Sequence, residues 1–251
     1  LYFKHDATPR ELVNTKDEIY KNFVRGVAIA LLNNRFTEIA VKENPPFLGA
    51  AVSNGSFILA STKDAFSVSV TCKTDKINEA LPYALCEVER ARRFGFTETE
   101  LNRRKASMLA GNEKRYAERT KITNDDYVGD YVSHFLNNTS ALSPEYEYEL
   151  SKEMLQRITL EEVNAVIPAL YTKKNRVAVS LAPENDSISY PGKEQLEMLL
   201  STIEATPLTP YVDNTSDAPL LEKLPEGGSV VTTEEGVWGA TVWTLSNGIK
   251  V

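Results

Sequence analysis

The order in which strand and helix patterns follow one another constrains the fold of this chain more than any other feature. In residues 66–73, Phe66, Val68, Val70 and Cys72 alternate with serines and threonines, which is typical of a half-buried antiparallel strand. The expected order is strand 1–5, helix 16–39, strands 47–60 and 66–73, helices 75–94, 97–119, 124–136, 144–157 and 160–170, and strand 175–181. Early and late strands separated by a block of helices predict an α+β fold, with an antiparallel sheet covered on one face by helices.

Helix starts in this order are marked by side chains that satisfy free backbone N–H groups. Such signals occur at Thr97-x-x-Glu100, at Thr159-x-x-Glu162 and at Ser143-Pro144. We expect Asp75 to cap the helix that contains Pro82. The pair Asn54-Gly55 indicates a bulge or a tight turn within the strand pattern of residues 47–60.

A change of composition divides the chain after residue 204, where a last predicted helix (193–204) ends. Residues 205–236 are rich in Pro, Gly, Thr, Asp and Glu, which predicts an acidic linker. Residues 183–235 hold 2 Lys and Arg against 11 Asp and Glu, so the net charge of −7 belongs mainly to this part. Residues 237–251 have a strand–Asn-Gly–strand pattern, typical of the first hairpin of a following domain. Because strand patterns are cut at both ends, we expect a fragment of a longer protein.

Charge and hydropathy exclude two classes of partner. The chain has no basic stripe that would bind nucleic acid. No apolar run reaches the roughly 18 residues that a membrane-spanning helix needs. Cys72 and Cys86 are too few for a disulfide framework and lack metal-type spacing, so both are predicted to be small buried apolar side chains.

The sequence also lacks the residues that hydrolytic chemistry requires. A catalytic zinc ion needs three protein ligands and an open position for water. The chain has no His-x-x-Glu-His motif, and its two histidines, His5 and His134, lie far apart in the sequence. We interpret His134 as a partly buried helix residue and His5 as an exposed strand end. No Gly-x-Ser-x-Gly motif or phosphate-binding glycine loop occurs either. We therefore predict neither a metal site nor catalytic residues within this chain.

Two further groups of side chains are interpreted as structural. Asp125 and Asp126 lie at a predicted helix start, where carboxylates interact favourably with the helix dipole. A series of tyrosines has roughly helical spacing and is predicted to belong to the core: Tyr116, Tyr127, Tyr131, Tyr146 and Tyr148.

Three segments give residues 1–204 a resemblance to a known family. They are Asn33-Asn34-Arg35-Phe36-Thr37-Glu38, Pro45-Pro46-Phe47-Leu48-Gly49-Ala50, and the helix run that ends in Asn175-Arg176-Val177. Together they resemble the non-zinc-binding domain of pitrilysin/insulinase-type zinc peptidases. The resemblance implies a half-barrel fold of the processing-peptidase type. It also implies that zinc is held by the catalytic domain of the parent protein, upstream or downstream of this chain.

The resemblance assigns a substrate-binding role to Arg35. In the family, the second half supplies an arginine that binds the backbone of an extended peptide, and usually a tyrosine seven residues later. Here Lys42 stands at that later position, and the nearest aromatic residue is Phe47, which lacks a hydroxyl group. The resemblance therefore implies substrate binding by Arg35 and, more weakly, by Phe47. The alternative is that Arg35 forms a structural ion pair, for example with Glu38.

Two functions remain in competition at this point. In the first, the chain is a non-catalytic, substrate-enclosing domain of a larger zinc metalloendopeptidase that hydrolyses peptides or unfolded proteins. Its partners would be the catalytic peptidase domain of the same parent chain, or of a homologous subunit, and the peptide substrate. In the second, the chain is a structural or partner-binding module that kept the peptidase fold without any role in proteolysis. A self-sufficient enzyme is a third and weaker reading.

Overall fold

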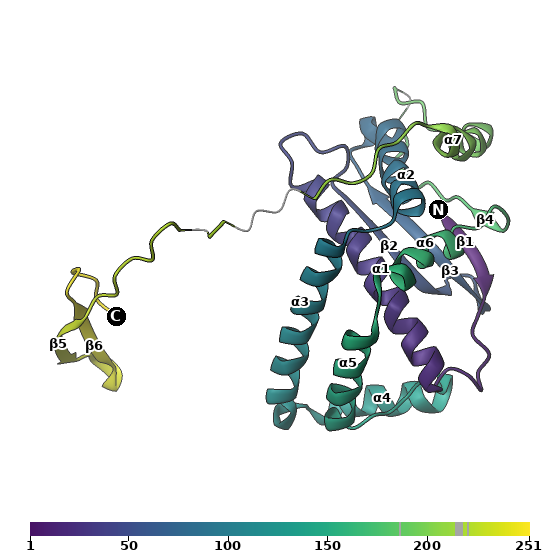
Figure 1. The fold of residues 1–251 in the computed structure, drawn as a ribbon. Coiled ribbons are helices and arrows are strands. Elements are labelled where there is room, and N and C mark those ends of the chain that lie inside the picture. Colours follow the sequence, from purple (N-terminus) through teal and green to yellow (C-terminus); the bar gives the residue numbers. More distant parts are fainter. Residues whose placement is uncertain (186, 214–217, 220) are drawn as a thin grey trace. The chain divides into compact units, whose positions relative to one another are not determined.

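The computed structural model describes residues 1–185, 187–213, 218–219 and 221–251. It divides into two compact units, Leu1–Asp213 and Asn214–Val251 (Figure 1). The first unit continues past residue 204, where the sequence predicts the linker to begin. Positions 214–217 and 220 of that predicted linker lie outside the described residues. None of the helices in the described part of the chain is long and apolar enough to cross a lipid bilayer.

The first unit contains a four-stranded sheet in the order β2-β3-β1-β4, with every neighbouring pair antiparallel. Its strands are β1 (Tyr2–Asp6), β2 (Gly49–Phe57), β3 (Ala60–Thr71) and β4 (Arg176–Val177). The bulge or tight turn predicted at Asn54-Gly55 is not found there, because both residues continue the ladder opposite Phe66 and Ala65. The register instead shifts just beyond them, between Ser56 and Phe57. The chain instead turns at Ile58 and Leu59, so β3 starts six residues earlier than expected.

Three helices lie on one face of this sheet, as the α+β prediction requires (Figure 1). They are α1 (Lys16–Ala40), α2 (Ile77–Phe94) and α6 (Leu160–Leu170). The hydroxyl oxygen of Thr15 caps α1 by accepting a hydrogen bond from the backbone N–H of Glu18. The predicted cap at Asp75 is wrong, because Asp75 lies within a 3₁₀ turn, η1 (Thr74–Lys76), that precedes α2. Pro82 lies inside α2 as expected.

A second group of helices extends away from the sheet: α3 (Glu98–Ala117), η2 (Arg119–Lys121), α4 (Asn124–Asn137) and α5 (Pro144–Arg157). The capping boxes predicted at Thr97 and Thr159 are present, and the Ser143 hydroxyl caps α5. A further capping box joins Thr123 and Asp126, which confirms the structural interpretation of this aspartate. The long helices α3 and α5 lie side by side (Figure 1).

The prediction that the tyrosine series belongs to the core is wrong. Tyr131 is 61% exposed and Tyr146 is 44% exposed. Tyr116 of α3 stacks on Tyr148 of α5 with ring centroids 4.5 Å apart, but both rings are only half-buried. Helical spacing shows which residues share a face, but it does not show whether another element covers that face. Here these ends of α3, α4 and α5 project beyond the sheet (Figure 1).

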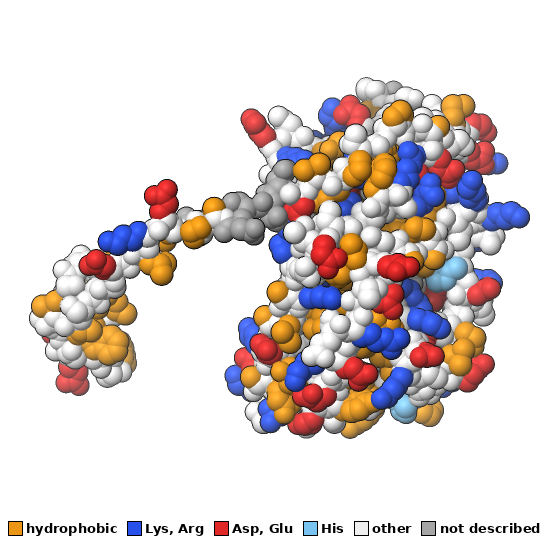
Figure 2. Space-filling model, viewed as in Figure 1, with side chains coloured by type: hydrophobic (Ala, Val, Ile, Leu, Met, Phe, Trp, Pro, Cys, Tyr) orange, Lys and Arg blue, Asp and Glu red, His pale blue; other side chains and the backbone are white. Residues whose placement is uncertain are grey.

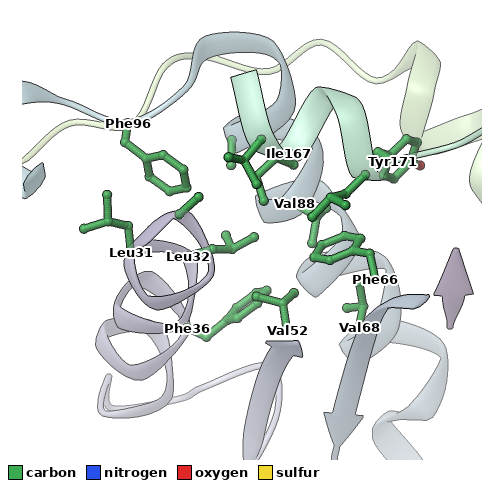
Figure 3. Close-up of a cluster of buried hydrophobic side chains, with 14 of the residues drawn as sticks. Leu31, Leu32, Phe36, Val52, Phe66, Val68, Val88, Phe96, Ile167 and Tyr171 are labelled. Carbon is green, nitrogen blue, oxygen red and sulfur yellow. The ribbon is translucent and has the colours of Figure 1, made fainter. Parts of the chain in front are cut away.

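The core lies between the sheet and the first group of helices (Figure 3). α1 contributes Leu32 and Phe36, which point toward Val52 of β2 and Phe66 of β3, and Leu31, which lies on the side of Phe96. Val88 of α2 and Ile167 of α6 close the cluster from the other side, together with Phe96 and Tyr171. Burying this much aliphatic and aromatic surface is the main stabilising term of such a layer.

The remaining elements are α7 (Lys193–Ala205), which belongs to the first unit, and the hairpin of the second unit. That hairpin joins β5 (Val230–Glu235) to β6 (Thr241–Leu245), with a 3₁₀ turn, η3 (Val237–Gly239), between them. Sequence analysis missed β5, which it placed in the linker. The expected Asn-Gly turn is present: Gly248 has φ +83°, and the backbone of Val251 pairs with Trp243.

Candidate functional site around Arg35

Arg35 lies in the last third of α1 and is 1% exposed. Its guanidinium group forms a two-pronged ion pair with Glu100 of α3, with Nε–Oε1 at 2.7 Å and Nη2–Oε2 at 2.8 Å. Nη2 also donates to the carbonyl oxygen of Gly95 at 3.0 Å, and Nη1 lies 3.5 Å from Glu87 of α2. Arg35 therefore joins α1, α2 and α3 at one buried point. The planar, five-donor guanidinium suits such a junction.

Aromatic rings cover Arg35. The ring of Phe96 lies 4.8 Å from the guanidinium carbon and the ring of Tyr211 lies 4.1 Å from it, both within cation–π range. The hydroxyl group of Tyr211 donates a hydrogen bond of 2.6 Å to Glu38. Burial, followed by this hydrogen bond, raises the pKa of Tyr211. Glu38, which the sequence suggests as an ion-pair partner of Arg35, instead accepts a hydrogen bond from Tyr211. The carboxylate that pairs with Arg35 is that of Glu100.

Tyr211 belongs to residues 206–213, here called the C-terminal strap. Arg93 of α2 donates to the carbonyl oxygen of Thr206 at 2.8 Å, and Arg90 donates to that of Thr209. At the end of the strap, Asp213 forms an ion pair of 2.7 Å with Arg103 of α3. Hydrogen bonds and an ion pair therefore hold the strap against the rest of unit 1, in a region where composition predicts a linker.

The charge of Asp213 is stabilised by these contacts. Burial alone would raise the pKa of its carboxyl group. Hydrogen bonds from Arg103, Thr99 and Thr97, together with the positive charge of Arg103, outweigh burial and hold the pKa below its ordinary value. The strap therefore ends on a carboxylate that is ionised at neutral pH.

The second predicted substrate residue, Phe47, is 2% exposed. Its ring lies between Phe36 and Tyr83 in edge-to-face contacts, with centroids 6.0 and 6.1 Å apart. In this conformation neither Phe47 nor Arg35 presents its side chain to solvent. Substrate binding by these two residues stays a prediction, and for Arg35 it would require the strap to move away from the guanidinium group.

Sequence analysis missed two carboxylates that contact Arg35, Glu87 and Glu100. It also missed Glu89 of α2, which pairs with Arg92 and Arg93. Glu87, Glu89 and Glu100 are buried, and Glu89 is fully so. Burial opposes the ionisation of Glu89, but hydrogen bonds from Arg92 and Arg93 lower its pKa overall. The signal available in the sequence is the spacing of Glu89 to Arg92 and Arg93, since residues three and four apart share a helix face.

Neither histidine has the environment of a metal ligand. His5 is half-buried and not exposed as predicted, and its Nε2 lies 2.8 Å from Oδ1 of Asn54. His134 is exposed, contrary to the prediction of partial burial, and its Nδ1 lies 2.6 Å from the carbonyl oxygen of Thr139. Among the described residues, no three His, Cys, Asp or Glu side chains come together in a way that could hold a metal ion.

Both cysteines are half-buried against the core rather than fully buried. Burial, and then the charge of Asp75, raises the pKa of the Cys72 thiol. Burial also raises the pKa of Cys86. Cys72 lines a cavity of about 380 Å³ with a mixed polar and apolar lining, together with residues of β3, α2 and α7. A thiol with a raised pKa is a poor nucleophile at neutral pH, so Cys72 is not a candidate catalytic nucleophile.

The conspicuous charged residues of the Arg35 centre join helices α1, α2 and α3 within the α+β fold. No family model matches the chain. A zinc protease PQQL-like protein of Arabidopsis thaliana is 24% identical to it over 221 residues, which are 88% of this chain and 20% of that protein. The chain is thus homologous to PqqL-like zinc proteases.

Solved structures agree with this relationship. The periplasmic protease PqqL from Escherichia coli matches 99% of this chain and 27% of its own, with a TM-score of 0.69 and 21% identity. The first half of the same protease matches 84% of this chain and 45% of its own, with a TM-score of 0.68 and 20% identity. An insulinase family protease from Yersinia pestis matches with a TM-score of 0.63 and 12% identity, over 81% of this chain and 43% of its own. The predicted fold and family resemblance are therefore confirmed, for a chain that spans between a fifth and a third of PqqL-type proteins.

Proposed function

We propose that this chain is a non-catalytic, substrate-enclosing domain of a larger zinc metalloendopeptidase that hydrolyses peptides or unfolded proteins. The observation that carries the proposal is the match between 84% of this chain and the first half of a periplasmic protease, in a sequence without a His-x-x-Glu-His motif. The zinc ion and the water that it activates would belong to another domain of the same protein. This chain would supply one wall of the space that encloses the substrate, and a surface that contacts the peptide.

Arg35 is the proposed substrate contact, and the strap decides whether a peptide can reach it. The guanidinium group lies beneath Tyr211, so a peptide carbonyl or carboxylate can bind it only when residues 206–213 are displaced. Phe47 belongs to the hydrophobic core. Under this proposal the closed strap observed here is the substrate-free arrangement.

The second candidate function is a structural or partner-binding module without a role in proteolysis. One observation favours it: Arg35 already has partners within the fold, namely Glu100, Glu87 and the Gly95 carbonyl oxygen. A guanidinium group engaged in this way stabilises the domain whether or not a peptide is present. The two functions therefore predict different effects on peptide binding when Tyr211 no longer covers Arg35.

The test is zinc-dependent cleavage of an unfolded peptide by the His-x-x-Glu-His half of the longer protein, with and without this chain. The first function expects strong stimulation by the chain. It also expects Tyr211→Ala, which uncovers Arg35, to lower the KM for the peptide, and Arg35→Lys to raise it in the Tyr211→Ala background. If this chain binds the His-x-x-Glu-His half and the cleavage rate does not change, the chain is a structural module.

A further inference from the structure

Helix α4 exposes an apolar face that no described residue of unit 1 covers. Val128, Tyr131, Val132, Phe135 and Leu136, here called the α4 face, follow one another at steps of three, one, three and one residues. This spacing places them on one side of a helix. Their exposed fractions lie between 49% and 79%, and α4 has no buried residue. In the view of Figure 2, hydrophobic side chains are interspersed with charged ones at the end of unit 1 where α4 lies (Figure 1).

Polar contacts at its two ends hold α4 in place. At the start, Thr123 and Asp126 form a capping box. At the end, Arg10 donates to the carbonyl oxygens of Phe135 and Leu136, and Asn138 donates to the carbonyl oxygen of Arg10. These bonds fix the helix without burying its apolar face. Isolated helices of this length are marginal in water, and most owe their stability to a buried face. The apolar face of α4 therefore has no use within unit 1.

The size of the face argues for an intramolecular occupant. Its five side chains expose on the order of 600 Å² in all, which is less than the about 800 Å² per partner of a standard interface between free proteins. A patch of this size is nevertheless enough when the partner is covalently connected, because the effective concentration within one polypeptide is in the millimolar range. The matched relatives offer such a partner, since this chain spans 20% of the plant protease and 27% of PqqL.

Charge argues against two other occupants. The helix contains Asp125, Asp126 and Asp130 and no lysine or arginine. Amphipathic helices that lie on membranes carry basic residues beside the apolar face, and anionic lipids would repel an acidic one. A second copy of α4, laid parallel on the first, would bring two sets of aspartates together. A domain with a neutral or basic rim around its own apolar patch has no such penalty.

We infer that the α4 face is the docking surface for another domain of the same longer protein, one that presents an apolar patch with a neutral or basic rim. This inference rests on the proposed function only in so far as the chain is part of a larger protease. It does not depend on Arg35 or on the strap, which lie at the α1–α2–α3 junction and not on α4.

The experiment compares backbone hydrogen exchange in α4 between this 251-residue chain and the longer protein. We expect exchange in residues 128–136 to be at least tenfold slower in the longer protein. The variant Tyr131→Ser/Phe135→Ser should abolish that protection. In the 251-residue chain the same variant should leave the melting temperature unchanged, because both side chains are exposed there. Ile58→Ser/Leu59→Ser is the matched control: it removes two exposed apolar side chains from the β2–β3 turn and should leave the protection intact.

Three results would overturn the inference. One is equal exchange of α4 in the two proteins. A second is protection of the 251-residue chain that rises with its concentration, which would assign the α4 face to self-association. A third is protection by vesicles of phosphatidylcholine and phosphatidylglycerol, which would assign it to a membrane. Peptide cleavage is measured separately, so α4 protection without any contribution to cleavage would overturn the proposed function and leave this inference standing.

Discussion

Arg35 and Glu100 are 65 positions apart in the sequence and share two hydrogen bonds, at 2.7 and 2.8 Å. Glu100 has a second role, because its Oε2 also accepts a hydrogen bond from the backbone N–H of Thr97 and so completes the capping box of α3. One carboxylate thus fixes the start of a helix and the place where that helix meets α1. The capping box is readable from sequence spacing, whereas the ion pair is not.

Removing one side of this ion pair should be strongly destabilising. Arg35→Ala leaves Glu100 buried and unpaired, and breaking a buried pair in this way costs about 3–5 kcal/mol. Urea unfolding of the 251-residue chain measures the change in free energy. The joint replacement Arg35→Met/Glu100→Leu should recover a large part of the loss, because it leaves no buried charge from this pair. The exposed pair of Arg115 and Glu147 is the control, and Arg115→Ala should cost less than about 1 kcal/mol.

The hydroxyl group of Tyr211 should stabilise the C-terminal strap. Tyr211→Phe removes the hydrogen bond to Glu38 and keeps the ring over Arg35, so we expect a loss of about 1–2 kcal/mol. Hydrogen exchange in residues 206–213 should increase more than elsewhere in the unit. Tyr146→Phe, on the exposed surface of α5, should change neither quantity. Unchanged exchange in the strap of Tyr211→Phe would show that the hydroxyl group does not hold it.

The stability that Asp213 contributes should depend on pH. Its pKa is lowered in the folded state, so its contribution is fully present above the ordinary aspartate pKa of about 4 and is lost as the pH falls through the lowered folded-state value. The difference in unfolding free energy between the wild type and Asp213→Asn should therefore be constant near neutral pH and shrink below about pH 4. Asp130→Asn, in α4, is the control. A difference that grows on acidification would contradict this assignment.

Gly95 should tolerate no side chain. It has φ +71° and ψ −158°, a backbone conformation that is almost restricted to glycine, and an added Cβ would lie 2.5 Å from the side chain of Asn164. Gly95→Ala should destabilise the chain by about 1–3 kcal/mol, because it adds backbone strain and disturbs the carbonyl oxygen that accepts from Arg35. Thermal unfolding measures the change.

Replacing Gly26 by alanine should have the opposite effect on thermal stability. This glycine lies in the interior of α1, and an added Cβ would meet nothing within 4 Å. Gly26→Ala should stabilise the chain by about 0.5–1 kcal/mol, since alanine loses less backbone entropy than glycine in a helix. Equal changes in stability for Gly95→Ala and Gly26→Ala would mean that alanine adopts the backbone conformation of Gly95 without strain.

Local physics made most of the fold predictable from the sequence. Alternation in residues 66–73, the periodicity of residues 16–39 and the capping boxes at Thr97 and Thr159 depend only on nearby residues, and the structure contains all of them. The errors are of a different kind. Asn54-Gly55 has the composition of a turn, but pairing with Phe66 and Ala65 keeps it in a strand.

Contacts between distant residues decided the rest. The family resemblance identified Arg35 as a residue of interest, but its partners Glu100 and Tyr211 are brought to it by the crossing of α1 and α3 and by the return of the strap. In the same way, the spacing of the apolar residues of α4 places them on one side of the helix, while only the arrangement of α3, α4 and α5 leaves that face uncovered within unit 1. Spacing along a chain fixes which side chains share a face, and tertiary packing alone decides whether that face meets protein or water.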